Sequence, residues 1–390
     1  MLASAAWASE EKVLWNFSGT NGDGSNPWSN YFISDAKGNL YGATASGGTY
    51  SNGMVFMLTP AGEEKILYEF QGQGAGDGSA PHGRLAFDAK GNIYGTTQAG
   101  GTNGTGTVYE LTKHGSAWKE QVLYTFSSGG LDGTSPSAGM TIAADGTMYS
   151  TTPDGGAYSA GAIFSLKKTG KGWQQTVIHS LDFSAGEGGF PYEGLMMDAA
   201  GNLYGGAPSG GSGGAGVIYR LSPTKQGWQY TNIYNFTGQN GDGSQLYWID
   251  LISDPAGNIY GATSFGGTNG TGTVWELVYS KAKKTYSESI LYEFGTSGDG
   301  NNPYGGLARD SKGNLYGTTL NGGSDGLGVV YKVTKHGKTW KETIVHNFAG
   351  GTTDGGKPTG NLFMDSTGRV YGMAENGGTS NLGIVYRMTP

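Results

Sequence analysis

The chain of 390 residues carries a formal net charge of −7 and has no basic segment, so nucleic acid is not an expected partner. It has no cysteine for disulfides or thiol chemistry, and no apolar run near the roughly 20 residues that a membrane-spanning helix needs, so we expect no membrane insertion. Its 75 glycines, 24 tyrosines and 14 phenylalanines favour many short strands joined by tight turns.

The first ten residues, MLASAAWASE, differ in character from the rest of the chain. They are rich in small residues and end in an Ala-x-Ala-like pattern, as the tail of a secretory signal does. We interpret residues 1–10 as a leader or signal remnant, with a cloning remnant as the alternative. This interpretation favours an extracellular or cell-surface location.

An internal repeat accounts for the remainder of the sequence. A string resembling Gly-Asn-Leu-Tyr-Gly-Thr-Thr recurs at successive spacings of 53, 55, 55, 56, 56 and 55 residues. Such periodicity is typical of propellers and other repeat architectures. Seven copies fill residues 11–390, so we expect one domain there. The seven strings begin at Gly38, Gly91, Gly146, Gly201, Gly257, Gly313 and Gly368.

The second copy shows what one unit builds. Alternating residues at 84–89 lead into a Lys-Gly-Asn turn, and further strands are expected at 93–99, 107–112 and 120–126. Four short antiparallel strands per repeat is the pattern of a propeller blade, and no segment has the periodicity of a crossover helix. The sequence therefore predicts an all-β protein, a seven-bladed β-propeller with four antiparallel strands per blade.

The two ends of the repeat array complement each other. Residues 11–17, EKVLWNF, match the fourth strand of a blade, whereas residues 383–388, GIVYRM, match the third. The last blade thus lacks an outer strand, and the N-terminal part of the chain holds a spare one. We predict that the N-terminal strand completes the last blade and closes the ring, which removes a free sheet edge.

Two motifs of the repeat are shared with a known family. Gly-Asn-Leu-Tyr-Gly occurs at Gly38, Gly201 and Gly313, and partner strands of the Gly-x-Val-aromatic type include residues 106–109 and 272–275. In these motifs, and over all seven units, the chain resembles the bacterial choice-of-anchor tandem-repeat GloVer-containing proteins. The resemblance implies an exported, secreted or cell-surface protein, and it implies no known reaction. Members of that family often end in a sorting segment, and this sequence stops at Pro390 without one.

Residues that break the repeat are the candidates for function, and they concentrate in the loop that enters the first strand of each blade. In a propeller these loops meet around the central channel, so we expect a cup at its mouth. Aromatic rings interspersed with polar groups suit sugars, whose C–H faces stack on rings while their hydroxyls need polar partners. The predicted substrate-binding residues are Trp28, Asn30, Tyr31, Tyr192, Tyr247, Trp248, Tyr304 and Asn361.

Four ionisable residues of the same loops are the predicted catalytic groups, namely His82, Arg84, Glu193 and Asp250. Glycoside hydrolysis uses one carboxylic acid and one carboxylate. We assign Glu193 as the acid and Asp250 as the base or nucleophile, and the reverse assignment stays open. Arg84 suits a carboxylate or sulfate on the substrate, or it neutralises the two acids in a channel ion network.

Other functions stay open at this point. A polysaccharide lyase would use His82 or a tyrosine (Tyr31, Tyr192 or Tyr304) as the base, with Arg84 neutralising a uronate. A non-catalytic propeller that binds a glycan or a surface ligand would use the same cup, and a structural envelope module would bind no small molecule. The clustered ionisable groups tilt the prediction towards a monomeric carbohydrate-active enzyme that acts on a polysaccharide or oligosaccharide.

The recurring acids of the Gly-Asp-Gly-like turns predict no metal site. Aspartate is favoured in turns because its side chain caps nearby backbone N–H groups. No spacing matches an EF-hand and no His/Cys cluster suggests zinc, so we expect neither a metal nor a cofactor. His179 and His346 replace an aromatic residue of the fourth strand and are interpreted as scaffold. The recurring acids are Asp23, Asp77, Asp132, Glu187, Asp242, Asp299 and Asp354.

Overall fold

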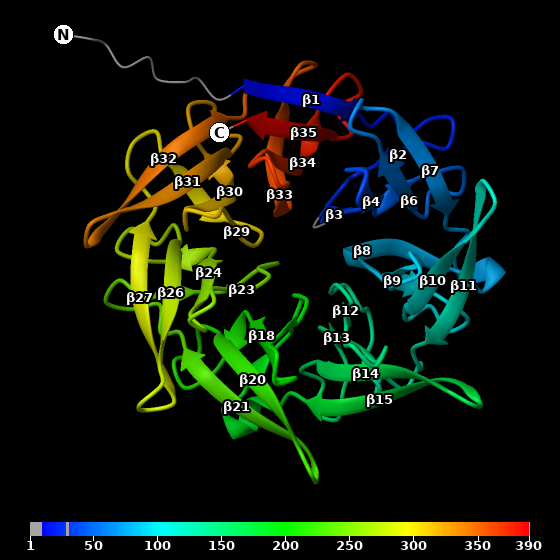
Figure 1. Cartoon of the computed structure of the whole chain (residues 1–390), viewed down its shortest axis with the longest axis horizontal. Helices are drawn as coiled ribbons and strands as arrows, with labels where there is room; N and C mark the ends of the chain where they lie inside the picture. The colour runs from blue at the N-terminus through cyan, green and yellow to red at the C-terminus, as the bar shows by residue number, and fades with distance from the viewer. Residues whose placement is uncertain (1–9, 29–30, 390) are drawn as a thin grey trace.

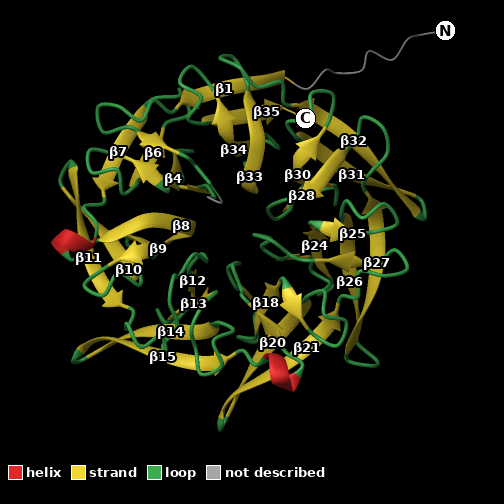
Figure 2. Ribbon diagram, turned by 180° about the vertical axis from the view of Figure 1, so that it is seen from behind, coloured by secondary structure: helices red, strands yellow, loops and turns green. Residues whose placement is uncertain are grey.

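The computed structural model describes residues 10–28 and 31–389 of the chain. Seven antiparallel sheets stand around a central channel, and each runs from the channel to the rim (Figure 1). This arrangement confirms the predicted all-β, seven-bladed propeller. The only helices in the described part are two single 3₁₀ turns at the rim, η1 (Gln73–Ala75) and η2 (Phe183–Ala185) (Figure 2). None of the described helices has the length and apolar character to cross a membrane.

The strands of each blade follow one another outward from the channel. Blade one contains β3 (Ile33–Ser34), β4 (Leu40–Thr44), β6 (Met54–Leu58) and β7 (Glu64–Glu69). Blade two contains β8 (Gly78–Phe87), β9 (Ile93–Gly100), β10 (Thr107–His114) and β11 (Ala117–Thr125). Blade three contains β12 (Thr141–Ile142), β13 (Met148–Thr152), β14 (Ala162–Thr169) and β15 (Gly172–Ser180).

The remaining blades repeat this order. Blade four contains β17 (Met196–Met197), β18 (Leu203–Ala207), β20 (Val217–Thr224) and β21 (Gly227–Asn235). Blade five contains β23 (Ile252–Ser253), β24 (Ile259–Thr263), β26 (Thr273–Ser280) and β27 (Thr285–Glu293). Blade six has β28 (Gly300–Pro303) and β29 (Ala308–Arg309) innermost, then β30 (Leu315–Gly322), β31 (Val329–His336) and β32 (Thr339–Asn347). Blade seven contains β33 (Gly355–Met364), β34 (Val370–Gly377), β35 (Ile384–Thr389) and β1 (Glu10–Asn16).

Short two-stranded ribbons extend three of the blades towards the entry loops. They pair β2 (Gly24–Ser25) with β5 (Ser46–Gly47), β16 (Gly188–Gly189) with β19 (Ser209–Gly210), and β22 (Gly243–Ser244) with β25 (Phe265–Gly266). In blade two the corresponding residues belong to one long first strand, β8. The sequence placed this strand at 84–89, but it begins at Gly78 because residues 78–82 also pair with β9.

Strand β1 closes the ring, as predicted from the ends of the repeat. It is the outermost strand of blade seven and runs antiparallel to β35, with Val13 opposite Tyr386 and Trp15 opposite Val385 (Figure 1). Its register skips Leu14, and blade one skips Leu67 at the same place. The N-terminal strand therefore reproduces even the bulge of an ordinary fourth strand.

The recurring Asp…Gly-Asn-Leu-Tyr-Gly motif builds one hairpin and one packing slot. In blade four the Asp198 carboxylate accepts hydrogen bonds from the backbone N–H of Asn202 at 2.9 Å, from its side-chain amide at 2.7 Å and from the Tyr204 hydroxyl at 3.1 Å. A Cβ on Gly205 would lie 2.4 Å from the Tyr219 hydroxyl oxygen, so only glycine leaves room for that ring. The motif is thus explained by structure in this copy.

The core consists of seven apolar clusters, each shared by two neighbouring blades. The cluster between blades one and two, for example, joins Val55 of β6 to Leu85, Ile93 and Tyr109 of the next blade. Because every blade packs on both neighbours, the ring holds the seven entry loops in fixed positions around the channel.

Candidate functional site in the central channel

One residue from the equivalent position of each blade, within or just before the first strand, lines the central channel. We call this ring the neck; it consists of Tyr31, Arg84, Gly139, Gly194, Asp250, Gly306 and Asn361. The first strands break their pairing here, and in β8 the register skips between His82 and Ala86. The neck backbone is therefore free to bond between blades, and the N–H of Met140 donates to the Arg84 carbonyl at 3.2 Å.

Three glycines of the neck make space for its larger side chains. The N–H of Gly194 donates to Asp250 Oδ1 at 2.9 Å, and the N–H of Gly306 donates to Asn361 Oδ1 in the same way. A Cβ on Gly139 would lie 2.8 Å from the Cβ of Arg84. Each polar side chain thus lies against a glycine of an adjacent blade, and the neck is built to hold Arg84, Asp250 and Asn361.

Two cavities open on the side of the neck that faces the first hairpin of each blade. The larger has a volume of about 450 Å³ and the smaller of about 320 Å³, and both are lined by Arg84, Asp250 and Leu251. Tyr31 and Asn361 line the smaller cavity. Around these polar groups the wall of the smaller cavity is largely apolar and includes Phe32, Ile252, Leu307, Phe363 and Met364. The wall of the larger cavity is mixed, with Ile142, Leu195, Met196 and Met197 beside Thr141 and Asp198. A concave space with apolar walls and a few convergent polar groups is the usual form of a ligand site.

The charged groups of these cavities are Arg84 and Asp250, which line both, together with Asp198 in the larger cavity and Arg309 in the smaller. None of the four ion pairs among the described residues involves Arg84. The pKa of Tyr31 is raised well above its usual value by burial and by the charge of Asp250, to which its hydroxyl donates, while Arg84 opposes the shift. Tyr31 is therefore a neutral hydrogen-bond donor, and the cavities combine a guanidinium, a carboxylate, a phenol and an amide.

The other side of the neck is closed by packed rings, which we call the aromatic cap: Trp28, His82, Tyr192, Tyr247 and Trp248. Trp248 is at its centre, with ring centroids 5.9 Å from Trp28, 5.9 Å from His82 and 4.9 Å from Tyr192. Tyr304 lies beside the cap, and a hydrogen bond links it to Trp248. These contacts join blades one, two, four, five and six across the channel.

His82 is enclosed by the cap. It is only 4% exposed, and burial lowers its pKa to about 4, so the imidazole is neutral near neutral pH. Its Nδ1 atom has no hydrogen-bond partner. Both Trp rings of the cap, by contrast, are partly exposed.

Glu193 lies apart from the cavities. Its side chain is 3% exposed, and Oε2 is 3.9 Å from the position that a Cβ on Gly206 would take. Neither carboxyl oxygen has a hydrogen-bond partner. Burial, reinforced by the charge of Asp250, raises the pKa of Glu193 well above its usual value, although nearby backbone N–H groups oppose the shift. The side chain is thus enclosed between blades four and five, where burial disfavours its charged form.

The single predicted cup is therefore divided in two. Trp28, His82, Tyr192, Tyr247, Trp248 and Tyr304 lie on the entry-loop side, whereas Tyr31, Arg84, Asp250 and Asn361 line the cavities on the other side. Asn30, also predicted to bind substrate, lies outside the described residues. Sequence reasoning missed the cavity walls, such as Met196, Met197 and Arg309. Period-2 alternation from the neck along each first strand would have pointed to some of them.

The recurring turn acids are bound as the structural interpretation predicts. Asp77 accepts hydrogen bonds from the backbone N–H of Gln71 at 2.7 Å, from the N–H of Gly78 at 2.6 Å and from the Tyr68 hydroxyl at 2.9 Å. Asp23, Asp242 and Asp299 are held by similar backbone bonds. Their recurrence is accounted for by the turn itself.

The fold and its repeat define the class, a closed seven-bladed propeller assembled from one sequence unit. Profile matches to the Gloeobacter/Verrucomicrobia repeat cover residues 5–187, 118–282 and 192–390. The chain belongs to this repeat family, which confirms the resemblance found in its motifs.

Further comparisons reach only distant proteins. No curated protein matches the sequence. Among solved structures, a luciferin-regenerating enzyme is similar at 12% identity, over 98% of this chain and 95% of that one, with a TM-score of 0.46. A putative oxidoreductase (glucose dehydrogenase) from Thermus thermophilus is similar at 14% identity, over 98% of this chain and 100% of that one, with a TM-score of 0.45.

Proposed function

We propose that this propeller is a recognition protein that binds an acidic sugar, as a free unit or as part of a polysaccharide, in the two channel cavities. The observation that carries the proposal is the position of Arg84, which lines both cavities and takes part in none of the ion pairs of the described chain. A guanidinium in such a place suits a carboxylate, which it can bind with two parallel hydrogen bonds.

The other polar groups of the cavities suit hydroxyl groups. Asp250 and Asn361 offer oxygen acceptors, the Asn361 amide offers N–H donors, and the Tyr31 oxygen, whose proton is donated to Asp250, offers a further acceptor. The apolar walls suit the C–H faces of a pyranose ring. A uronate, which combines a carboxylate with several hydroxyls on one ring, matches this set better than a neutral sugar does.

Burial favours recognition over hydrolysis. A glycosidase needs both carboxyl groups at the scissile bond. Asp250 lines the cavities, but Glu193 is 3% exposed and is not among the residues that line them. The same reasoning weighs against a lyase, because His82 is enclosed by the aromatic cap and the raised pKa of Tyr31 makes its phenol a poor base.

We also propose a location for the protein and a role for the aromatic cap. An exported or cell-surface protein would meet polysaccharides there, in keeping with the small-residue leader at 1–10 and with the repeat-family resemblance. The aromatic cap keeps the neck rigid, and the partly exposed rings of Trp28 and Trp248 offer a stacking surface on the opposite face.

The test is binding of galacturonate and glucuronate oligosaccharides, measured by isothermal titration calorimetry beside the matching neutral oligosaccharides. Wild type should prefer the uronates. Arg84→Gln should weaken their binding about tenfold or more, since a hydrogen bond to a charged group is worth about 1.5–3 kcal/mol. Arg369→Gln is the matched control, because Arg369 lines neither cavity and pairs with Asp365 at 2.7 Å.

The possible outcomes distinguish recognition from catalysis and the channel cavities from the aromatic cap. Equal affinity for neutral and acidic sugars, or an unchanged affinity in Arg84→Gln, would remove the basis of the proposal. Release of shortened or unsaturated products, lost in Glu193→Gln, Asp250→Asn or Tyr31→Phe, would replace recognition by catalysis. Binding that is lost in Trp248→Ala and retained in Arg84→Gln would move the site to the cap.

A further inference from the structure

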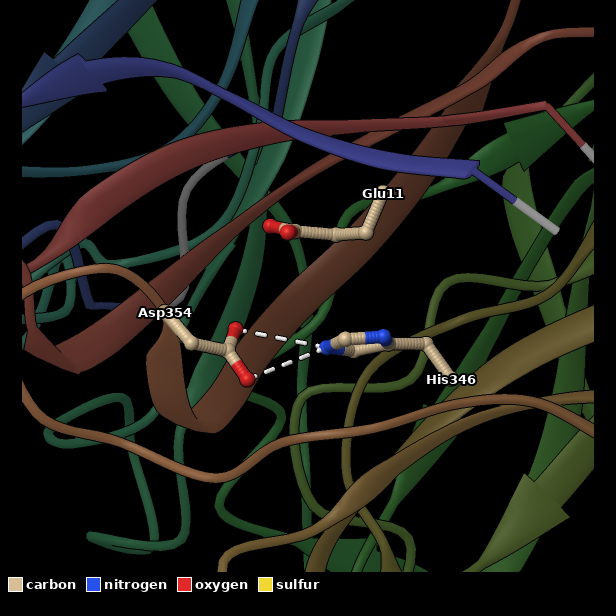
Figure 3. Close-up of side chains that lie close together, drawn as sticks. All are labelled: Glu11, His346 and Asp354. Carbon is tan, nitrogen blue, oxygen red and sulfur yellow. Dashed lines mark hydrogen bonds and ion pairs between the residues drawn. The ribbon is translucent and has the colours of Figure 1, made fainter.

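Three side chains from distant parts of the sequence meet where strand β1 closes the ring. Glu11 comes from β1, His346 from β32 in blade six, and Asp354 from the turn that precedes β33 (Figure 3). One ligand atom from each lies within 4.8 Å of the others. His346 Nε2 is 3.2 Å from both carboxylate oxygens of Asp354. In the described part of the chain this is the one group of three or more potential ligands at such distances.

The repeat shows that this combination is peculiar to blade seven. In most other blades the position of His346 is a tyrosine whose hydroxyl binds the turn acid, as Tyr124 does with Asp132 at 2.6 Å. A histidine also occurs where blades three and four meet, and His179 of β15 lies 2.8 Å from Glu187 of blade four. There the position of Glu11 is taken by Tyr230, which stacks on His179 with centroids 4.5 Å apart.

Within this group the carboxylate of Asp354 is held by backbone hydrogen bonds, whereas the Oε1 atom of Glu11 has none. Asp354 accepts hydrogen bonds from the N–H of Ala349 at 2.7 Å and from the N–H of Gly355 at 2.6 Å, which hold its carboxylate in place. Glu11 Oε1 is buried and has no hydrogen-bond partner. Two carboxyl groups thus face each other with one nitrogen donor between them, an arrangement that a cation would stabilise.

We propose that Glu11, His346 and Asp354 bind one divalent transition-metal cation of the Zn²⁺ class. Zinc ligands lie about 2 Å from the ion, which places tetrahedral ligand atoms about 3.3 Å apart. The separation of His346 and Asp354 already has about this value, and a shift of the Glu11 side chain by at most about 1.5 Å completes the set.

The donor set selects the class of metal. A neutral imidazole nitrogen with two carboxylates suits Zn²⁺ and its neighbours, whereas Ca²⁺ and Mg²⁺ prefer oxygen ligands alone. Two carboxylates balance the charge of a divalent ion, and water would complete the coordination. Binding fastens the N-terminal strand to blades six and seven, so the metal acts as a clip on the closure of the ring.

The experiment uses the full chain after chelator treatment and dialysis. Calorimetric titration with Zn²⁺ should give one site, and saturating Zn²⁺ should raise the thermal midpoint of unfolding, because a ligand of the native state stabilises it. Ca²⁺ should give neither effect. With Co²⁺ as the probe, the visible absorption bands should be those of a nitrogen–oxygen ligand set.

Three variants make the test specific. His346→Tyr introduces the residue that most other blades have at this position, so it should fold, and it should weaken Zn²⁺ binding at least tenfold. Glu11→Gln keeps the strand and should do the same. His179→Tyr is the matched control, because blade four lacks the second carboxylate, and its Zn²⁺ affinity should equal that of wild type. Absence of Zn²⁺ binding by wild type, or affinities unchanged in both His346→Tyr and Glu11→Gln, would overturn the proposal.

Discussion

Replacing Glu120 by glutamine should remove one contribution to the pH dependence of the protein's stability. The repeat places the same kind of contribution in most of its blades. Glu120 of β11 lies near Asp77, the turn acid of its own blade, and its Oε1 atom is buried without a hydrogen-bond partner. Burial, followed by the charge of Asp77, raises the pKa of Glu120 to about 8. The neighbouring phenols of Tyr68 and Tyr109 have pKa values raised by burial and these acids, so they stay neutral.

The sign of the effect follows from proton binding. Between pH 4.5, the ordinary pKa of glutamate, and pH 8, the folded chain holds a proton on Glu120 that the unfolded chain has released. The contribution to the free energy of unfolding is therefore complete below pH 4.5 and declines as the pH rises to 8. The pKa change corresponds to at most about 5 kcal/mol. Because the side chain keeps some contact with solvent, we expect about 1–2 kcal/mol.

Glutamine imitates the protonated acid and cannot lose a proton. Thermal and urea unfolding of Glu120→Gln should match wild type near pH 5 and exceed it by about 1–2 kcal/mol near pH 8.5. Blade three shows that the side chain fits, since Gln175 has the equivalent position and donates to the Asp132 carbonyl at 3.1 Å. The reverse change, Gln175→Glu, should destabilise more at pH 8.5 than at pH 5. Equal pH dependence in Glu120→Gln and wild type would refute this reasoning.

Other predictions concern the scaffold and the cap. Gly205→Ala should destabilise by about 1–3 kcal/mol because its Cβ would meet the Tyr219 ring, whereas Gly129→Ala, whose Cβ meets nothing within 4 Å, should be neutral in urea unfolding. Deleting residues 1–16 removes β1 and should cost at least about 3 kcal/mol and promote association through the exposed β35, as measured by thermal unfolding and light scattering. His82 should contribute about 2–3 kcal/mol that is present above pH 6.5 and lost as the pH falls through 4, and His82→Phe should abolish that loss relative to wild type. If the free energy of unfolding falls at acidic pH as steeply in His82→Phe as in wild type, His82 is accessible to solvent.

Sequence analysis was sufficient for the architecture because each blade is specified locally. The turn acid Asp198, the Tyr204 that reaches it and the Gly205 that leaves space for a neighbouring ring are all visible in one short string. The ring closure was also predictable, since β1 carries the apolar pattern of a fourth strand. The start of β8 was misplaced because its bulge at residues 83–85 interrupts the alternation on which strand prediction depends.

The candidate site was predicted only as a set of residues. The sequence predicts that the entry loops meet at the channel, and the structure places them there. The sequence does not show how far along the channel axis each side chain lies. Neighbours such as Glu193 and Gly194 differ in environment, because one side chain turns between the blades while the other position contributes an N–H to Asp250. The grouping of Glu11 with His346 was missed for a different reason, since it depends on two strands that meet only when the ring closes.

Departures from a repeat can be sorted by whether they preserve the contacts of the position. His179 and Glu187 replace the usual tyrosine and aspartate and keep a hydrogen bond between them at 2.8 Å, so the change is a structural equivalent. Arg84 takes a neck position that is glycine in three blades and lines two cavities without an ion pair among the described residues. Glu11 has the ordinary glutamate of its position, yet its new neighbour His346 converts a common acid pair into a nitrogen–oxygen ligand set. A function in this fold therefore depends on polar atoms that the repeat leaves without a partner inside the blade, and those atoms are the ones to mutate first.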